Sequence, residues 1–230
     1  MSETIYTIPI SEAFEQDAIC PLCALKHRFA TELADQLCGS AVMEPDVRIE
    51  TNRLGLCQVH FAALLSRQKR LSLALIQETH LMAIAEVLAG EGKRSRKSDP
   101  VAERLCEIAQ SCYICERLDK QETQAISNTV HRFKRDADFR DLFSKREDFC
   151  LPHVAAMLST AKRELGSKYD EFAAVLLAGF SAQLSNLLTD VRGFVASFDY
   201  RNAGKPLTEG ERLAVEAVIP FLTGYDCTQL

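Results

Sequence analysis

The stretch Gly55–Ser66, GLCQVHFAALLS, opens with a Cys-x-x-His pair and continues with the apolar spacing of an amphipathic helix. A related stretch, DFCLPHVAAMLS, occupies Asp148–Ser159, with Cys, His, Ala-Ala, Leu and Ser in the same order and at the same intervals. The chain therefore carries the same helix start twice, which indicates an internal repeat.

A Cys-x-x-Cys pair precedes each Cys-x-x-His pair, at nearly the same distance in both halves of the chain. The eight candidate metal ligands are Cys20 and Cys23, Cys57 and His60, Cys112 and Cys115, and Cys150 and His153. Two such groups three residues apart can converge on one ion when the backbone turns between them, and a helix N-terminus stabilises the thiolate that a metal needs. The spacing therefore predicts two metal sites, each with three Cys and one His.

Three sulfur ligands and one nitrogen suit a tetrahedral zinc ion, so we expect two zinc ions per chain. The alternatives are iron–sulfur clusters, in which His can replace Cys, or reversible oxidation of the same thiols. The spacing leaves open whether each Cys-Cys pair joins the Cys-His pair of its own half or that of the other half.

Helical periodicity dominates the chain and predicts an all-α fold, a helical bundle made of two related repeats with metal ligands at helix starts. We expect a first helical metal-binding repeat over residues 1–90, a basic linker over 91–100, and a second repeat over 101–230 with a C-terminal helix extension. The terminal helix is predicted to begin at Thr208, a residue type that caps helices.

Composition narrows the class of protein. The net charge of −5 over 230 residues offers no general attraction to nucleic acid. The first residues lack the basic and apolar regions of a signal peptide, and nine cysteines fit metal ligands or reduced thiols, so we expect a cytoplasmic protein. The most apolar run, Phe172–Phe180, is too short to cross a bilayer and is interpreted as a buried helix segment.

A site with four protein ligands has no open position for water, which favours structural over catalytic zinc. The sequence contains no Gly-rich phosphate loop, nucleophile elbow or His-Glu-x-x-His motif, and we assign no catalytic residue. We therefore expect a binding or scaffold module rather than an enzyme, with a protein partner or a second copy of the chain as its partner. A redox or iron–sulfur protein that uses the same residues is the alternative.

Several residues stay outside this pattern. We interpret His27, His80 and His131 as histidines on helix surfaces or interfaces, and Cys38, Cys106 and Cys227 as buried or partly buried thiols. The segment FDYRN, Phe198–Asn202, either forms a polar recognition site or fastens the C-terminal helix through Asp199 and Arg201.

The same motifs resemble a family of bacterial and archaeal proteins known only as a domain of unknown function. Its members are similar in having Cys-x-x-Cys, then Gly-Leu-Cys-x-x-His, the same pairs again, and an aromatic-Asp-Tyr-Arg-Asn segment. That segment corresponds here to Asp199, Tyr200, Arg201 and Asn202. The second half departs from the pattern, since Asp148-Phe149 stands where the first half has Gly55-Leu56. The resemblance implies the repeat and no activity.

Overall fold

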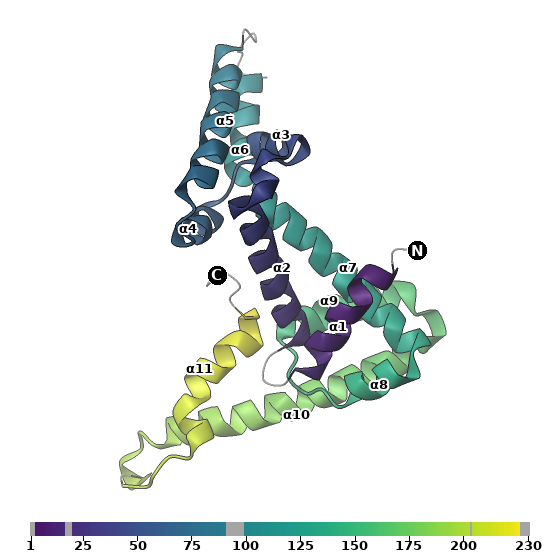
Figure 1. Cartoon of the computed structure of the whole chain (residues 1–230). Coiled ribbons are helices and arrows are strands. Elements are labelled where there is room, and N and C mark those ends of the chain that lie inside the picture. The colour runs from purple at the N-terminus through teal and green to yellow at the C-terminus, as the bar shows by residue number, and fades with distance from the viewer. Residues whose placement is uncertain (1–2, 17–19, 91–98, 203, 226–230) are drawn as a thin grey trace. The chain divides into compact units, whose positions relative to one another are not determined.

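The computed structural model describes residues 3–16, 20–90, 99–202 and 204–225, and these contain helices and no β-strand (Figure 1). The helices are α1 (Glu3–Glu15), α2 (Pro21–Cys38), η1 (Ser40–Met43), α3 (Pro45–Leu54), α4 (Gln58–Ser66), α5 (Arg70–Ala89), α6 (Pro100–Gln110), α7 (Tyr113–Arg135), α8 (Ala137–Ser144), α9 (Leu151–Glu164), η2 (Gly166–Lys168), α10 (Tyr169–Ala196), η3 (Tyr200–Asn202) and α11 (Glu209–Thr223), where η marks a 3-10 helix. The predicted all-α fold is confirmed, and Thr208 caps α11 as expected.

The described residues form two compact units. The first contains residues from 1–25 and 122–226, and the second contains those from 26–121. Each unit therefore combines parts of both halves of the sequence, and α2 and α7 each contribute to both units. Of the predicted linker, residues 91–98 lie outside the described residues, whereas Asp99 caps α6 and Pro100 is its first residue. The division into repeats 1–90 and 101–230 stays a prediction about the sequence.

An aromatic core holds the first unit together. Its six buried phenylalanines are Phe14, Phe133, Phe139, Phe143, Phe149 and Phe172. The rings of Phe14 and Phe139 lie 5.0 Å apart, as do those of Phe133 and Phe172, in the edge-to-face arrangement that aromatic pairs prefer. Because Phe149 immediately precedes Cys150, this core fixes the entry into α9.

A buried arginine anchors the loop between α8 and α9. The Arg146 guanidinium donates to both carboxylate oxygens of Asp148 and to the backbone carbonyls of Phe14 and Gln16 at the end of α1. A buried guanidinium is tolerated only when its donors are satisfied in this way. Arg146 therefore ties the residues before Cys150 to the residues that lead into α2.

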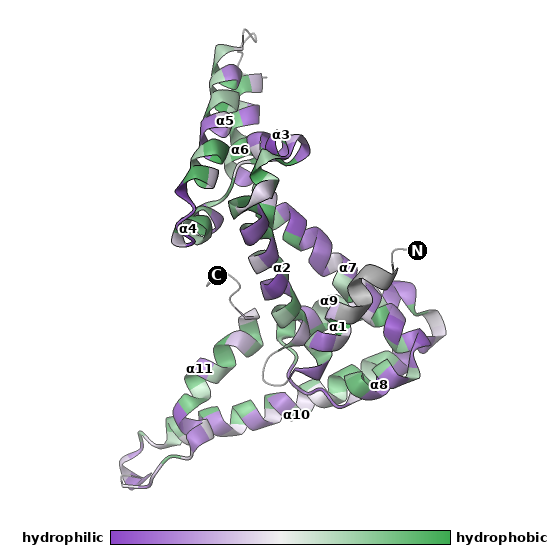
Figure 2. Ribbon diagram, viewed as in Figure 1, coloured by the Kyte–Doolittle hydropathy of each residue, from purple (hydrophilic) through white to green (hydrophobic). Residues whose placement is uncertain are grey.

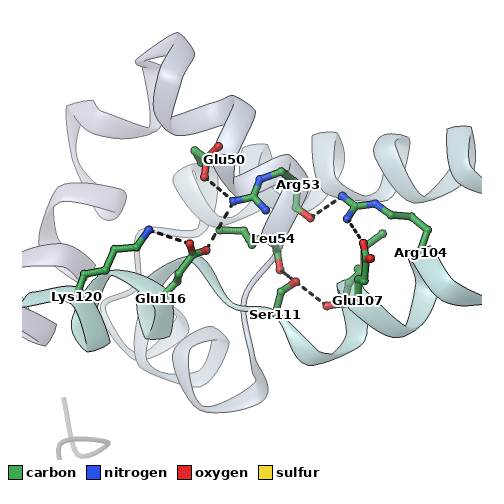
Figure 3. Close-up of polar contacts among 9 residues, drawn as sticks. Glu50, Arg53, Leu54, Arg104, Glu107, Ser111, Glu116 and Lys120 are labelled. Carbon is green, nitrogen blue, oxygen red and sulfur yellow. Dashed lines mark hydrogen bonds and ion pairs between the residues drawn. The ribbon is translucent and has the colours of Figure 1, made fainter. Parts of the chain in front are cut away.

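Polar contacts fix the corner between α6 and α7 against the end of α3 in the second unit (Figure 3). The Ser111 hydroxyl lies 2.8 Å from the Leu54 carbonyl oxygen and 3.0 Å from that of Ile108, within hydrogen-bond distance of both. The Arg53 guanidinium is paired with Glu50 at 2.8 Å and lies 3.6 Å from Glu116 of α7. Together with the hydrogen bond from Tyr113 N to Gly55 O, these contacts align the starts of α4 and α7.

Gly55 occupies a backbone conformation reserved for glycine, with φ 62° and ψ −159°. A Cβ atom at this position would lie 2.5 Å from Nε2 of His80, whose Nδ1 in turn bonds to the Asn52 carbonyl at 2.8 Å. His80 is thus an interface histidine as expected, and it packs against the turn that leads into Cys57.

Two helical segments, Arg70–Ala89 and Gly166–Ala196, have the length and apolar composition of membrane-crossing helices, and no more than 11% of the apolar window in either is buried. Figure 2 shows hydrophobic residues distributed along both α5 and α10.

The interpretation of Phe172–Phe180 as a buried segment is wrong: Phe172 and Leu176 are buried, but Leu177 and its neighbour Ala178 are exposed. Apolar composition alone did not reveal that no other described element of the first unit covers one face of α10.

We expect Gly55→Ala to destabilise the protein more than Gly166→Ala does, because the backbone conformation costs a residue with a side chain about 1 to 3 kcal/mol and the new Cβ would also meet the His80 ring. The matched control is Gly166→Ala, because Gly166 also has positive φ but a Cβ there would meet no atom within 4 Å. Urea denaturation of both variants measures the difference. Equal destabilisation would show that the contact with His80 is unimportant.

Candidate metal centres

Two groups of four potential ligands converge in the structure, and together they contain all eight predicted residues. Site 1 consists of Cys20, Cys23, Cys150 and His153, and site 2 consists of Cys57, His60, Cys112 and Cys115. In each site, the four ligand atoms all lie within 4.8 Å of one another. The pairing that the sequence left open is therefore crossed: each Cys-Cys pair meets the Cys-His pair from the other half of the sequence.

Both sites are built from helix N-termini. The first residue of each ligand pair immediately precedes a helix: Cys20 precedes α2, Cys57 α4, Cys112 α7 and Cys150 α9. The second residue follows three positions later, so both side chains reach the open end of the first turn. The Cys57 and Cys150 thiols make no capping hydrogen bond and are directed to the clusters instead. The helix dipoles there favour thiolate over thiol.

The spacing in site 1 is close to that of a tetrahedron around one ion. Bond lengths of about 2.3 Å to sulfur and 2.0 Å to nitrogen place tetrahedral sulfurs about 3.8 Å apart and sulfur about 3.6 Å from nitrogen. In site 1 the sulfurs of Cys23 and Cys150 are 3.6 Å apart, and Nδ1 of His153 lies 3.4 Å from Cys20, 3.3 Å from Cys23 and 3.1 Å from Cys150.

Site 2 has the same internal spacing. The sulfurs of Cys57 and Cys115 are 3.9 Å apart, and Nδ1 of His60 lies 3.2 Å from Cys57, 3.3 Å from Cys112 and 3.4 Å from Cys115. Both histidines therefore present Nδ1 to the three sulfurs. The donor set and its dimensions fit a single tetrahedral ion at each site.

The pKa values in site 1 reflect crowded thiols. Hydrogen bonding to Cys150 and Cys20, together with burial, raises the pKa of Cys23. Burial alone also raises the pKa of Cys20, but hydrogen bonds from Cys150, Cys23 and His153 bring it well below its usual value. Burial alone lowers the pKa of His153, yet hydrogen bonds with Cys150, Cys20 and Glu122 outweigh it and raise the pKa to about 11. Without a bound metal ion, the His153 imidazolium is the cation beside the Cys20 thiolate.

Site 2 lacks such an internal cation. Burial lowers the pKa of His60, while burial and the neighbouring thiols Cys112 and Cys57 raise the pKa of Cys115 to about 12. Burial likewise raises the pKa of Cys112. The metal-free cluster therefore disfavours several thiolates at once, and a bound dication would remove that penalty.

Glu122 supports the histidine of site 1. Its Oε1 lies 2.8 Å from Nε2 of His153, the ring nitrogen opposite the one that faces the sulfurs. This carboxylate–histidine arrangement fixes the tautomer and ring orientation and makes the imidazole a better ligand. Glu122 was not predicted from the sequence, because it belongs to no ligand motif. It lies at the site only because α7 passes His153 in the folded chain.

The turn after α11 covers site 1. The backbone N–H of Tyr225 donates to Sγ of Cys23 at 3.3 Å. At Gly224, with φ 81°, a Cβ atom would lie 3.7 Å from Sγ of Cys23 and 3.8 Å from that of Cys150. This contact was also missed, because nothing in the sequence marks the turn as part of the site. All four ligand residues of site 1 are consequently buried, whereas Cys57 and Cys115 of site 2 are partly exposed.

A cavity of about 420 Å³ borders site 1 between α10 and α11. Cys20 and Cys150 form part of its wall, and the charged residues in its lining are Asp148 and Glu216. Asp148 is held by Arg146, so its carboxylate is engaged in the loop anchor and is not directed at a metal ligand position. The cavity therefore provides access to the flank of site 1 without an evident catalytic group.

The remaining candidates lie outside the two metal groups. Nε2 of His131 lies 3.2 Å from Glu164, in agreement with an interface histidine. Cys38 is partly buried as predicted, but Cys106 is exposed, so that prediction was wrong; Cys227 lies outside the described residues. Cys106 lies on α6, where Val101 is the buried residue, so its thiol is left in solvent.

The segment FDYRN forms a turn after α10, and its polar side chains bond within the turn and to the last residue of α10. Arg201 donates to Asp199 at 2.6 Å from Nη2, and the Asn202 side chain donates to the Ala196 carbonyl at 2.8 Å. Tyr200 is 85% exposed, so its phenol does not anchor the turn. Asp199 and Arg201 thus form an ion pair with each other at the end of α10, and this pair does not fasten α11.

The chain belongs to a family of unknown function (DUF6062), whose model matches residues 1–228. This agrees with the resemblance drawn from the motifs. A search of curated proteins and a search of solved structures each gave no match.

Paired substitutions test the crossed arrangement. Cys20→Ser with Cys150→Ser removes two ligands from one site and should leave about one metal ion per chain, whereas Cys20→Ser with Cys57→Ser damages both sites and should leave about none. Elemental analysis of the purified variants measures the metal content. The reverse order would mean that each site forms within one half of the sequence.

Glu122→Gln should lower the metal affinity of site 1 by about 10- to 100-fold, the usual effect of removing a carboxylate behind a ligating histidine. Competition with a chromophoric chelator should show one weakened site and one unchanged site. Glu164→Gln is the matched control, because Glu164 contacts His131 and no ligand. Equal affinities in both variants would contradict a supporting role for Glu122.

Proposed function

We propose that this protein is a helical binding or scaffold module whose two clusters each hold a structural zinc ion. The observation that carries the proposal is that three sulfurs and one Nδ1 atom converge at each site with tetrahedral dimensions. Each ion would join two helix starts that are distant in sequence. Cys20 and His153, for example, are separated by 133 positions.

A single ion is favoured over a multi-iron cluster by the size of the sites. An iron–sulfur cluster places several irons and sulfides between its ligands, so the ligand atoms must spread apart. Ligand atoms within 4.8 Å of one another leave room for one ion. Zinc is favoured over a single iron because it prefers tetrahedral thiolate and imidazole ligands and brings no redox chemistry.

A binding role is favoured over catalysis because all four coordination positions are supplied by the protein. The eight cysteines that the structure describes are all free thiols, which supports a reducing, cytoplasmic location. The chain's net charge of −5 supports a protein partner rather than nucleic acid.

A redox role at site 2 is the second candidate, and the exposure of its sulfurs favours it. Cys57 and Cys115 are partly exposed and 3.9 Å apart. An oxidant such as a peroxide could therefore reach them, and thiolate oxidation would remove two metal ligands together.

Metal analysis of protein purified anaerobically and without a metal-affinity tag tests the proposal. We expect about two zinc ions per chain, no sulfide and no colour, with loss of helical circular dichroism or a lower melting temperature after chelation. Iron with matching sulfide would overturn the zinc assignment. Zinc that is removed by peroxide from one site, and restored by a thiol reductant, would favour the redox candidate.

A further inference from the structure

Helix α10 has an exposed face that no other described element of its own unit covers. Its opposite side is packed: Phe172 and Leu176 are buried, and the ring of Phe180 stacks on Phe221 of α11 with centroids 4.9 Å apart. On the free side, Leu177 and Leu184 are each 44% exposed and Leu188 is 43% exposed. From Phe172 to Thr189 the helix contains no charged residue. Such a face is unusual for a helix surface left in water.

A series of exposed residues along this face follows the alternating three- and four-residue spacing of a helix–helix seam, and Leu177 and Leu184 flank it. The seam positions, all exposed, are Glu171, Ala174, Ala178, Ser181, Ser185, Leu188, Arg192 and Val195. Small side chains occupy the middle of the seam, which lets a second helix approach closely, and it extends over about 36 Å of helix. Both properties suit a long partner helix better than a small ligand.

The seam is complementary to itself when reversed about a point between Ser181 and Ala182. In an antiparallel pair of α10 helices, Glu171 of one copy would face Arg192 of the other, once on each side of the axis. Ala174 would face Thr189, which is also exposed, and Ala178 would face Ser185. An isologous two-fold interface requires such reciprocal matching, whereas binding to an unrelated protein does not.

Charge supports this occupant over a lipid surface. Helices that lie in a membrane interface carry Lys and Arg along their polar face and are attracted to anionic lipids. The seam has one basic residue, Arg192, and the whole chain has a net charge of −5. Arg192 has no ion pair within the described residues, whereas Glu171 is paired with Lys168 at 2.8 Å in its own chain. Arg192 is therefore the charge that gains most from a partner.

We propose that this face of α10 is a homodimer interface, in which two copies of the chain pair antiparallel about a two-fold axis near Ser181. The inference uses α10 alone and is independent of which metal the clusters hold. The resulting protein would display two copies of each metal cluster, and its scaffold role would be that of a dimer.

The test is the molar mass of the full-length, metal-loaded protein by sedimentation equilibrium across a range of concentrations. We expect a dimer for the natural sequence. Ser181→Arg would bring two like charges together at the axis and should weaken the dimer by about 100-fold or more. Asn186→Arg, an exposed position on the same helix but off the seam, should leave the mass unchanged. Unchanged metal content and circular dichroism would show that each variant is folded.

A charge exchange tests the orientation. Glu171→Arg and Arg192→Glu should each weaken the dimer, and the double variant should restore it, because residue 171 of each copy then again faces an opposite charge. A monomer at all concentrations, no effect of Ser181→Arg, or no recovery in the double variant would overturn the antiparallel dimer. Flotation of a monomeric protein with vesicles of neutral or anionic phospholipid would instead assign the face to a membrane. Metal content is measured separately, so failure of this inference leaves the zinc proposal standing.

Discussion

The convergence of helix N-termini on shared sulfur and imidazole groups is the constraint on which the rest of the structure depends. Each site places three thiols and one imidazole within 4.8 Å of one another. Helix dipoles and free N–H groups favour thiolates there, but mutual repulsion and burial oppose them, as the raised pKa values of Cys112 and Cys115 show. A bound cation would resolve this conflict. Because it would join residues distant in sequence, it would also close long loops, where a cross-link restricts the unfolded chain most.

The two sites share a ligand set but differ in their surroundings. In site 1, Glu122 orients His153, and the turn at Gly224 and Tyr225 covers the sulfurs. In site 2, neighbouring contacts such as that between Ser111 and Leu54 align the backbone, while two of the sulfurs remain partly exposed. Two sites with the same four ligands can therefore exchange a metal ion at different rates, because solvent access and the hydrogen bonds to the ligands affect the rate at each site. Site 1 is the more enclosed of the two candidate sites, and site 2 is the more accessible one.

Sequence patterns predicted the parts of this structure that depend on local geometry. A helix start places its first residue and the residue three positions later at the same open turn, so pairs such as Cys57 and His60 identify ligands and helix ends together. The crossed pairing was not predictable, because it depends on the tertiary path between the pairs. Glu122 was missed for the same reason. The error at Phe172–Phe180 has another origin: apolar composition indicates a need for burial but does not say whether the covering surface belongs to the same chain.

Crossed pairing gives the duplication a physical meaning. One half of the sequence supplies one Cys-Cys pair and one Cys-His pair, and the structure does not combine these two with each other. A chain that contained only one half could complete such crossed sites only by sharing its ligand pairs with a second chain. Assembly of the sites would then depend on the concentration of that second chain. Joining both halves in one polypeptide makes the encounter intramolecular, at a much higher effective concentration. The repeated motif is therefore required by the geometry of each site, because neither half can supply all four ligands in this arrangement.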